Sequence, residues 1–366
     1  MSRLSFFWFL PSAGDGRYLV AEEGRRRLTR QYAQQIAQAA EHLGFDGMLL
    51  PTGGGCEDAW IAASSLIPVT EKLKFLIAVR PGLITAPVAA QMAATFDRFS
   101  NGRLLINVVA GGSSYLQKAE GLFLDHDARY ELTDEFLTVW RELMEGHEVT
   151  FHGKHVHVEK ARLPLQSSRR SYPPLYFGGS SEEGIRTAAK HADTYLTWGE
   201  PPHMAAQKIA EVKAAAEEKG RHLRFGIRLH VVVRETEDEA FRAAHNLLRD
   251  VDANLVKKFQ RAFRASESVG QHRMSDLHCG RLDNLEVSPN LWAGIGLVRT
   301  GAGTALVGTP EIVAERIEEY RHIGFDTFIL SGYPHLEEAY LFGESVLPLF
   351  RQDESQLSDS VFAAGG

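Results

Sequence analysis

The sequence is poor in cysteine, in long apolar runs and in positive charge, and each shortage excludes a class of protein. Its two cysteines, Cys56 and Cys279, are too few for a disulfide framework. The mostly apolar run at residues 4–10 is too short to span a bilayer, and no signal-peptide pattern is present. The formal net charge of −7 disfavours a nucleic-acid partner. We therefore expect a cytoplasmic protein with no membrane and no nucleic-acid partner.

What the chain does contain is a repeated unit of helix, glycine and strand. Residues 42–50, HLGFDGMLL, resemble residues 322–330, HIGFDTFIL, near the other end of the chain. In both copies a glycine stands where a helical pattern stops, and an apolar strand pattern follows. Two copies far apart in the sequence indicate a repeated β/α architecture.

Eight short apolar segments, each followed by a helical pattern, predict an α/β protein with a closed (β/α)8 TIM barrel. The barrel would occupy residues 1–351 as a single catalytic domain, with a hairpin-like insertion that ends near residue 165. A second insertion, at about 265–308, is too long for an ordinary connection, and we expect a mobile loop over the site. Residues 352–366 are expected to form a flexible C-terminal tail. The expected strands are residues 4–10, 47–51, 74–79, 103–109, 175–177, 194–197, 224–233 and 327–330.

The strand at residues 224–233 carries an arginine and a histidine on one face. Alternation along a strand puts Arg228 and His230 on one side, and Ile227 and Leu229 on the other. Burying an unpaired guanidinium costs several kcal/mol, so this face either meets a carboxylate or binds an anion. Strand carboxyl ends hold the active site in such barrels, which favours an anion-binding wall.

Two glycine-rich segments carry further candidates. Residues 178–181, GGSS, stand between a strand and a helix, where free N–H groups and two hydroxyls suit a phosphate. An ordinary turn with a serine helix cap fits this segment equally well. Arg299 lies within residues 292–301, WAGIGLVRTG, where it either swings onto a ligand or remains a solvated surface residue.

Three other patterns favour a structural role over a catalytic or ligand-binding one. His152, His155 and His157 have no acidic residue at ligand spacing, so we expect no metal site. Residues 301–304, GAGT, do not complete a dinucleotide-binding fingerprint. Cys56 follows three glycines at a strand end. A nucleophile would need a base nearby in space, which the sequence does not show, so a small lining residue is favoured.

Longer motifs resemble those of the bacterial alkanesulfonate monooxygenases, which belong to the bacterial-luciferase-like group of reduced-flavin monooxygenases. The resemblance spans about residues 4–350. It rests on FWFLP at 7–11, CEDAW at 56–60, YPPLYFGGSS at 172–181, YLTWGEPP at 195–202, FGIRLH at 225–230, SPNLWAG at 288–294 and SGYPHLEEAY at 331–340.

The resemblance implies a (β/α)8 barrel that takes reduced FMN from a separate NAD(P)H:FMN reductase. Oxygen then gives a flavin peroxide that attacks the sulfonate, and C–S cleavage yields sulfite and an aldehyde. Members are homodimers or homotetramers. The small organosulfonate would be the second partner of the enzyme.

Matching positions also imply roles for individual residues. Arg228 and Arg299 would hold the sulfonate and act in catalysis together with His230. Trp198, Tyr333 and His335 would line the same pocket. The positions implied for the FMN are Gly179, Ser180, Ser181, Tyr130, Asn107, Ala78 and Cys56.

Three departures from the family pattern bear on the substrate. Ser12-Ala13 replaces Thr-His, residues 53–55 are GGG in place of Gly-Arg-Ser, and residues 110–114 are AGGSS in place of Thr-Gly-Ser-Asp-Pro. An imidazole and a guanidinium are thus lost at the mouth, which frees volume beside the arginine pair. The leading candidate is the sulfosugar sulfoquinovose, and a linear alkanesulfonate is the alternative. Rival functions on the same barrel are a deazaflavin-dependent oxidoreductase and a flavin-binding accessory protein.

Overall fold

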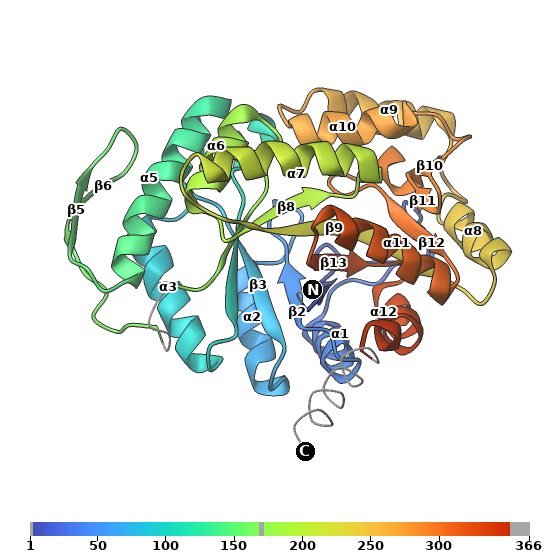
Figure 1. Ribbon diagram of the computed structural model, residues 1–366, viewed down its shortest axis with the longest axis horizontal. Coiled ribbons are helices and arrows are strands. Elements are labelled where there is room, and N and C mark those ends of the chain that lie inside the picture. The colour runs from blue at the N-terminus through green and yellow to red at the C-terminus, as the bar shows by residue number, and fades with distance from the viewer. Residues whose placement is uncertain (1–2, 168–171, 352–366) are drawn as a thin grey trace, which may run out of the picture.

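The computed structural model of the chain describes residues 3–167 and 172–351, and its centre is a closed barrel of parallel strands (Figure 1). Neighbouring strands pair in the order β9-β13-β1-β2-β3-β4-β7-β8, and pairing between β8 and β9 closes the ring. The predicted TIM barrel is therefore confirmed, and the expected tail at 352–366 lies outside the described residues. The barrel strands are β1 (Ser5–Phe9), β2 (Gly47–Leu50), β3 (Lys74–Val79), β4 (Leu104–Val108), β7 (Leu175–Phe177), β8 (Thr194–Trp198), β9 (Arg224–Val233) and β13 (Thr327–Ser331).

Helices follow the strands and cover the outside of the barrel (Figure 1). Several begin at a side-chain cap: the side chains of Thr29, Asp125, Ser181 and Thr309 each accept a hydrogen bond from a backbone N–H in the first turn. The outer helices are α1 (Arg30–His42), α2 (Ala59–Leu66), the short η1 (Ile67–Val69), α3 (Ala86–Phe99), α4 (Ser114–Ala119), α5 (His126–Met144), α6 (Glu182–His191), α7 (Pro202–Glu217), α11 (Pro310–Ile323) and α12 (His335–Ser345).

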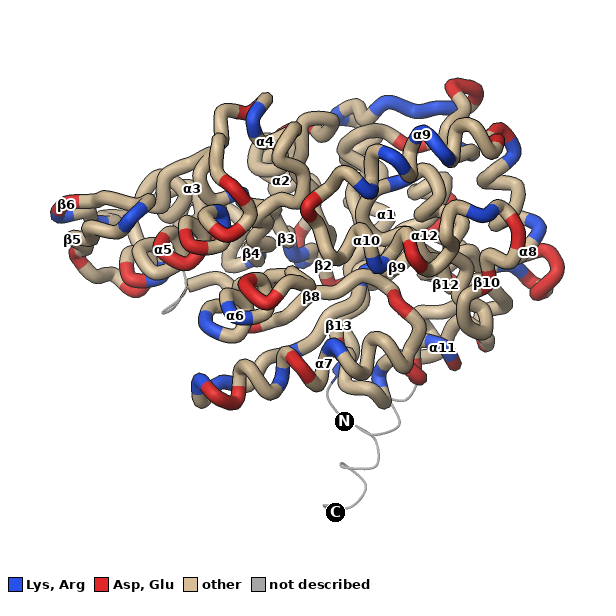
Figure 2. The backbone as a smooth tube through the Cα atoms, turned by 90° about the horizontal axis from the view of Figure 1, so that it is seen from above, with Lys and Arg blue, Asp and Glu red and all other residues tan. Residues whose placement is uncertain are grey.

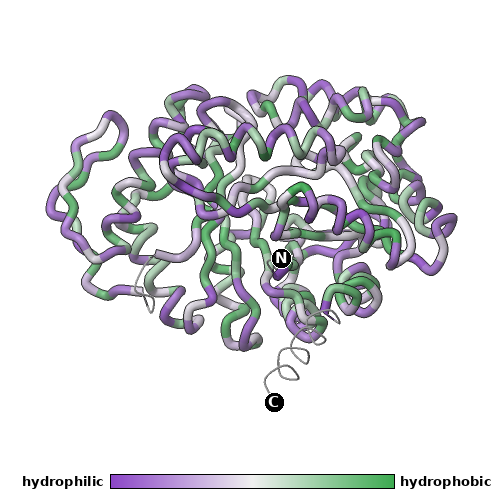
Figure 3. The backbone as a smooth tube through the Cα atoms, in the orientation of Figure 1, coloured by the Kyte–Doolittle hydropathy of each residue, from purple (hydrophilic) through white to green (hydrophobic). Residues whose placement is uncertain are grey.

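Apolar side chains fill both faces of the strands, as expected where helices cover a parallel sheet. The outward-facing side chains join the helices in the largest core cluster. Figure 3 shows the same layering, with apolar strands at the centre and polar residues on the surrounding helices. Inside the barrel, a small cluster seals the interior below the mouth: Phe7, Leu49, Leu76, Leu105, Tyr176 and Ile329.

The first insertion is the expected hairpin, formed by β5 (Val149–His152) and β6 (His157–Ala161), and it projects from one side of the barrel (Figure 1). Its histidines do not converge on one point. His152 and His157 face each other across the hairpin with ring centroids 6.2 Å apart, while His155 contacts Glu131 at 3.1 Å.

The second insertion contains regular structure where a loop was expected at 265–308. Before it, α8 (Glu237–Asn246) and α9 (Ala253–Arg264) are separated by a turn. The remaining elements are α10 (Val269–His278), β10 (Glu286–Ser288), β11 (Leu291–Trp292), the short helix η2 (Gly294–Leu297) and β12 (Ala305–Gly308).

Strand β9 joins this insertion to the barrel. Its first half pairs with β8, up to the pair of Trp198 with Arg228. Its second half pairs with β12, starting at the pair of Ala305 with His230. The predicted arginine and histidine therefore lie where β9 changes neighbours.

Basic and acidic residues are interspersed over the helices and loops around the barrel (Figure 2). None of the helices within residues 3–167 and 172–351 has the length and apolar content that a membrane crossing requires.

Candidate active site

A ring of side chains points into the barrel mouth above the sealed interior. Because side chains alternate along a strand, positions two residues beyond the interior cluster face the same way. Trp198 and Arg228 are register partners across β8 and β9, as Ala78 and Asn107 are across β3 and β4. The ring comprises Phe9, Ala78, Asn107, Trp198, Arg228 and Ser331.

Arg228 and His230 are connected through one hydroxyl. Arg228 Nη2 donates to Ser331 Oγ at 2.7 Å, and that hydroxyl lies 2.7 Å from His230 Nδ1. His230 Nε2 lies 3.1 Å from the carbonyl oxygen of Ala302, which only accepts. The proton of the neutral ring is therefore on Nε2, and Nδ1 accepts from Ser331. The chain of bonds fixes both side chains in one orientation.

We expect Ser331→Ala to lower kcat/KM about 10- to 100-fold. The substitution removes the acceptor of Arg228 and the donor to His230, and a hydrogen bond to a charged group contributes about 1.5–3 kcal/mol. Steady-state release of sulfite, the product that the resemblance implies, measures the effect. Ser65→Ala on α2 is the control, because that hydroxyl donates to the Ala62 carbonyl oxygen on the outer wall. Unchanged kinetics in Ser331→Ala would show that the hydroxyl has no role in the site.

Arg228 has no carboxylate partner in the described part of the chain. Its guanidinium carbon lies 4.4 Å from the centre of the Phe9 ring. Burial, together with the positive charge of Arg299, lowers the pKa of Arg228 to about 10. The buried ion pair that the sequence left open is therefore not found, and the charge of Arg228 remains available to an anion.

Arg299 approaches the same place from the insertion. It lies in a loop of residues 296–303 whose ends meet, with Gly296 N donating to Gly303 O at 2.9 Å. The Arg299 guanidinium carbon lies 5.4 Å from the centre of the Tyr333 ring. Tyr333 in turn stacks on His230, with centroids 5.4 Å apart, and meets the edge of His335 at 5.0 Å. The structure thus brings five of the predicted site residues together.

His335 is positioned by Asp15, which lies in the segment between β1 and α1. Asp15 Oδ2 accepts from the backbone N–H of His335 at 2.7 Å and lies 3.4 Å from its Nδ1. The same carboxylate accepts from Tyr32 at 2.8 Å and from Arg26 at 3.1 Å. Burial alone would raise the pKa of Asp15, but these donors, His335 foremost, lower it to about 2. The carboxylate is therefore charged at neutral pH.

Buried histidines predict that the protein loses stability in mild acid. Burial lowers the pKa of His230 well below its usual value and that of His278 on α10 to about 4. Below about pH 6.5 the unfolded chain therefore binds protons that the folded chain does not. We expect the free energy of unfolding to fall between pH 6.5 and 5.5 by about 1 kcal/mol for each histidine that stays neutral, because the unfolded imidazole is half protonated at pH 6.5.

Urea unfolding at pH 7.5, 6.5 and 5.5 measures this slope. His278→Asn is the matched variant, since an amide oxygen can still accept from the N–H of Gly280, as His278 Nδ1 does at 2.9 Å. The variant should show a shallower loss of stability than the parent. Equal slopes in the two proteins would mean that His278 is not held neutral.

A second group forms around the start of α6. Ser181 caps this helix, and its Oγ accepts from Gly184 N at 3.2 Å. A Cβ atom on Gly179 would lie 3.2 Å from the hydroxyl of Tyr130 and 3.0 Å from Gly184 Cα, so the turn packs closely against α5 and α6. Burial raises the pKa of the Tyr130 hydroxyl, and the nearby Ser181 side chain opposes this shift. These hydroxyls and the free N–H groups of the first turn are donors of the kind that a phosphate accepts.

Helix α10 connects the two groups. A Cβ atom on Gly270 would lie 3.2 Å from the Trp198 ring and 3.6 Å from Ser180 Oγ. The helix is anchored by Arg273, which donates to both carboxylate oxygens of Glu200 at 2.6 and 2.8 Å. Lys208 donates to the same buried carboxylate at 2.9 Å. The insertion therefore forms a wall of the mouth beside the expected phosphate site.

Cys56 is not joined to either group by a hydrogen bond or ring contact among the described residues. Its backbone N–H donates to Gly53 O at 2.9 Å, within the loop between β2 and α2. That loop meets the first strand end, where Glu57 N donates to Ser12 O at 3.3 Å. The role implied for Cys56 beside the flavin therefore stays a prediction.

Sequence reasoning missed Ser331 and Asp15 as parts of the site. A signal was present for Ser331, because alternation along the last strand places it two residues after the inward-facing Ile329. No local signal marked Asp15: its partners Tyr32 and His335 are 17 and 320 residues away.

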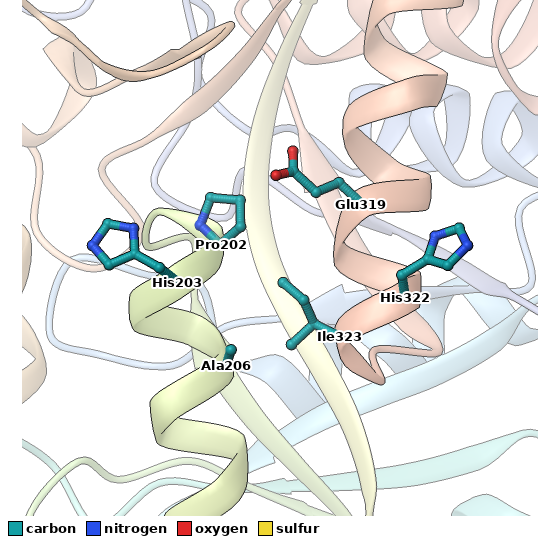
Figure 4. Close-up of a pocket in the computed structure, with 6 residues that line it drawn as sticks. All are labelled: Pro202, His203, Ala206, Glu319, His322 and Ile323. Atoms are coloured by element: carbon teal, nitrogen blue, oxygen red, sulfur yellow. The ribbon is translucent and has the colours of Figure 1, made fainter.

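A separate pocket of about 440 Å³ lies on the outer wall between α7 and α11 (Figure 4). Its two imidazoles, of His203 and His322, point away from each other (Figure 4). The pocket includes none of the predicted site residues. Its lining is Pro202, His203, Ala206, Glu319, His322 and Ile323.

Solved structures share this fold at low sequence identity. Riboflavin lyase, solved with modified FMN and its substrate riboflavin, is 23% identical over 96% of this chain and 92% of its own, with a TM-score of 0.80. The EDTA monooxygenase of Chelativorans sp. BNC1 is 18% identical over 96% and 94%, with a TM-score of 0.78. A tetrahydromethanopterin reductase of Methanopyrus kandleri, dependent on a deazaflavin coenzyme, is 17% identical over 95% and 100%, with a TM-score of 0.68.

These likenesses show the fold, and the family follows from the sequence itself. A sequence model of the family described as luciferase-like monooxygenase matches residues 4–327, which is most of the chain. The chain therefore belongs to the luciferase-like monooxygenase family.

Proposed function

We propose that this protein is a sulfonate monooxygenase that uses reduced FMN and oxygen to release sulfite and an aldehyde. The observation that carries the proposal is the pair Arg228 and Arg299, which lie close enough for the charge of Arg299 to act on Arg228. Arg228 lies over Phe9 and Arg299 over Tyr333, and neither has a carboxylate partner in residues 3–167 and 172–351. Two like charges held in a buried mouth oppose each other, so they favour a ligand that neutralises both. A tetrahedral oxyanion presents several acceptors to two guanidinium groups.

The residues present fit a flavin. The hydroxyls of Tyr130, Ser180 and Ser181 beside the α6 N-terminus offer donors to the phosphate, and the small Ala78 and the polar Asn107 leave the strand ends open to a flat ring. FMN in riboflavin lyase, which shares the fold, supports this choice. When bound, reduced flavin would supply the electrons that activate oxygen.

The side chains of this chain would orient the sulfonate and carry its charge. Arg228 and Arg299 bind the sulfonate oxygens, and both guanidinium groups remain to stabilise the sulfite that leaves with the C–S electron pair. The carbon becomes an aldehyde with one oxygen atom of O2, and the other oxygen atom ends as water. His230, neutral with its proton on Nε2, keeps Arg228 aligned through Ser331. Trp198, Tyr333 and His335 exclude water from this space.

We propose sulfoquinovose as the leading substrate and a linear alkanesulfonate as the alternative. The short side chains at Ser12-Ala13, at residues 53–55 and at residues 110–112 support a wide mouth, since each stretch follows a barrel strand. Ser12 Oγ is buried and has no hydrogen-bond partner in the described chain, which leaves one polar group for a hydroxylated substrate.

The test is sulfite release with reduced FMN and oxygen across sulfoquinovose, methanesulfonate and octanesulfonate. Sulfite from any of them supports the function, and the ratio of kcat/KM values identifies the substrate. No sulfite from the sugar would end the sulfoquinovose proposal. Reaction without oxygen uptake would favour the deazaflavin rival, and tighter binding of oxidised than of reduced flavin would favour an accessory protein.

Three further features of the proposal concern partners and location. A separate NAD(P)H:FMN reductase would supply the reduced flavin, which places the reaction in the cytoplasm with the nicotinamide pool. We also propose a homodimer or homotetramer. Large exposed apolar side chains support self-association: Ile61 on α2, Tyr115 on α4 and Phe123 are 74%, 80% and 74% exposed.

A further inference from the structure

Two buried glutamines flank the loop that carries Arg299. This loop, residues 296–303, projects between helices α9 and α10 of the insertion, and its two ends are in contact. A Cβ atom on Gly303 would lie 2.6 Å from Gly296 Cα, so the base of the loop is as narrow as a backbone allows. Arg299 is near the tip, and its own N–H donates to Ile295 O at 3.1 Å.

Gln260 of α9 holds the side of the loop that precedes Arg299. Its Nε2 donates to the carbonyl oxygens of Gly296 and Leu297, both at 3.0 Å. Carbonyl oxygens only accept, so the amide nitrogen must face the loop. The side chain is buried, and its Oε1 has no hydrogen-bond partner in the described chain.

Gln271 of α10 holds the side that follows Arg299. Its Oε1 accepts from Gly301 N at 3.0 Å, and because an N–H only donates, the amide oxygen must face the loop. This side chain is also buried, and its Nε2 has no partner in the described residues. Each glutamine thus leaves half of its amide unpaired, which opposes folding, while the other half bonds to this one loop.

We propose that Gln260 and Gln271 are positioning residues for Arg299. Their bonds hold the loop before and after the arginine, so the guanidinium stays over Tyr333 and faces the mouth that Arg228 shares. Because a carboxamide has no charge, the glutamines fix the backbone without neutralising Arg299, as a carboxylate would. The inference rests on the proposed function, in which Arg299 binds the sulfonate head group.

A double-mutant cycle tests the inference. The ligand is methanesulfonate, which carries little beyond the head group, titrated by calorimetry into anaerobic full-length protein saturated with reduced FMN. We expect Arg299→Ala to weaken binding about 30-fold or more. Gln260→Met and Gln271→Met, which keep the side-chain volume, should each weaken it about 5- to 20-fold alone. In the Arg299→Ala background neither should add more than about 2-fold, since the glutamines act through the arginine.

Gln117→Met is the matched control. Gln117 of α4 is as buried, and its Nε2 donates to Ala110 O at 3.1 Å, away from the Arg299 loop. This variant should bind methanesulfonate within about 2-fold of the parent. If either glutamine substitution weakens binding as much in the Arg299→Ala background as in the parent, the positioning role is overturned, while the proposed function is not affected. Absence of binding by the parent protein to methanesulfonate, octanesulfonate and sulfoquinovose alike would instead overturn the proposed function.

Amide hydrogen exchange gives a reading that needs no ligand. Peptides covering residues 294–304 should exchange faster in Gln260→Met and Gln271→Met, while peptides of β1 to β4 should be unchanged. If this segment exchanges at the same rate in the variants as in the parent, the proposal is overturned, whatever the binding measurements show.

Discussion

Replacing Arg228 with alanine is expected to lower kcat/KM for the sulfonate that we propose as substrate by about 10²–10³-fold, while leaving the protein as stable as before, or more stable. Removing a fixed donor from charge that develops in a transition state has an effect of this size. The guanidinium has no carboxylate partner in the described chain and lies near the charge of Arg299, so burying it opposes folding. Removing the guanidinium should therefore keep or raise the free energy of unfolding while it lowers the activity.

The two measurements separate function from structure. Sulfite release gives kcat/KM, and urea unfolding gives the stability of the same variant. Arg228→Lys is the matched substitution: it keeps the charge but not the planar fork, and its activity should lie between those of the parent and the alanine variant. A marked loss of stability in Arg228→Ala would show instead that the arginine belongs to the packing of the barrel.

The largest effect on stability is expected for Asp15→Ala, at about 3–5 kcal/mol of unfolding free energy. The buried carboxylate of Asp15 accepts from Tyr32, Arg26 and the backbone of His335, which come from three parts of the chain. Alanine would leave the Tyr32 hydroxyl and the His335 N–H without this acceptor, while Arg26 would keep its bonds to Glu337. Removing one member of a buried charged network has an effect of this size.

Urea unfolding at pH 7 measures the change. Asp15→Asn should lose less, because an amide oxygen still accepts from Tyr32 and from the His335 N–H. Tyr32→Phe, which removes one bond of the set, should lose about 0.5–1.5 kcal/mol. A loss below about 1 kcal/mol in Asp15→Ala would mean that the carboxylate does not hold the segment between β1 and α1 to the barrel.

The barrel could be predicted from the sequence because each strand has its own local pattern of apolar residues. Residues 42–50 and 322–330 repeat one helix-glycine-strand unit, and in the structure both supply barrel strands, β2 and β13. Alternation in β9 likewise placed Arg228 on the face that points into the mouth, as its contact with Phe9 shows. Periodicity is a property of neighbours in the chain, so it can be read without coordinates.

The parts that could not be predicted depend on residues distant in sequence. The β12–β9 pairing joins Ala305 to His230 across 75 positions, and no local sequence pattern near either residue indicates it. The same holds for Asp15, whose partner His335 lies 320 positions away. The insertion was expected to be a loop because it is too long for an ordinary connection, although it contains α10 and β12.

The change of neighbours along β9 limits how the substrate range of this enzyme can be altered. Exchanging residues 265–304 with those of a relative would look like swapping a surface loop, yet the exchanged segment ends one residue before β12, the strand that pairs with β9 at His230. A one-residue error in that join would turn the side chains of β12 to the opposite face and move the Ala302 carbonyl away from the imidazole. Grafts should therefore end before Gly301, so that the parent register is kept.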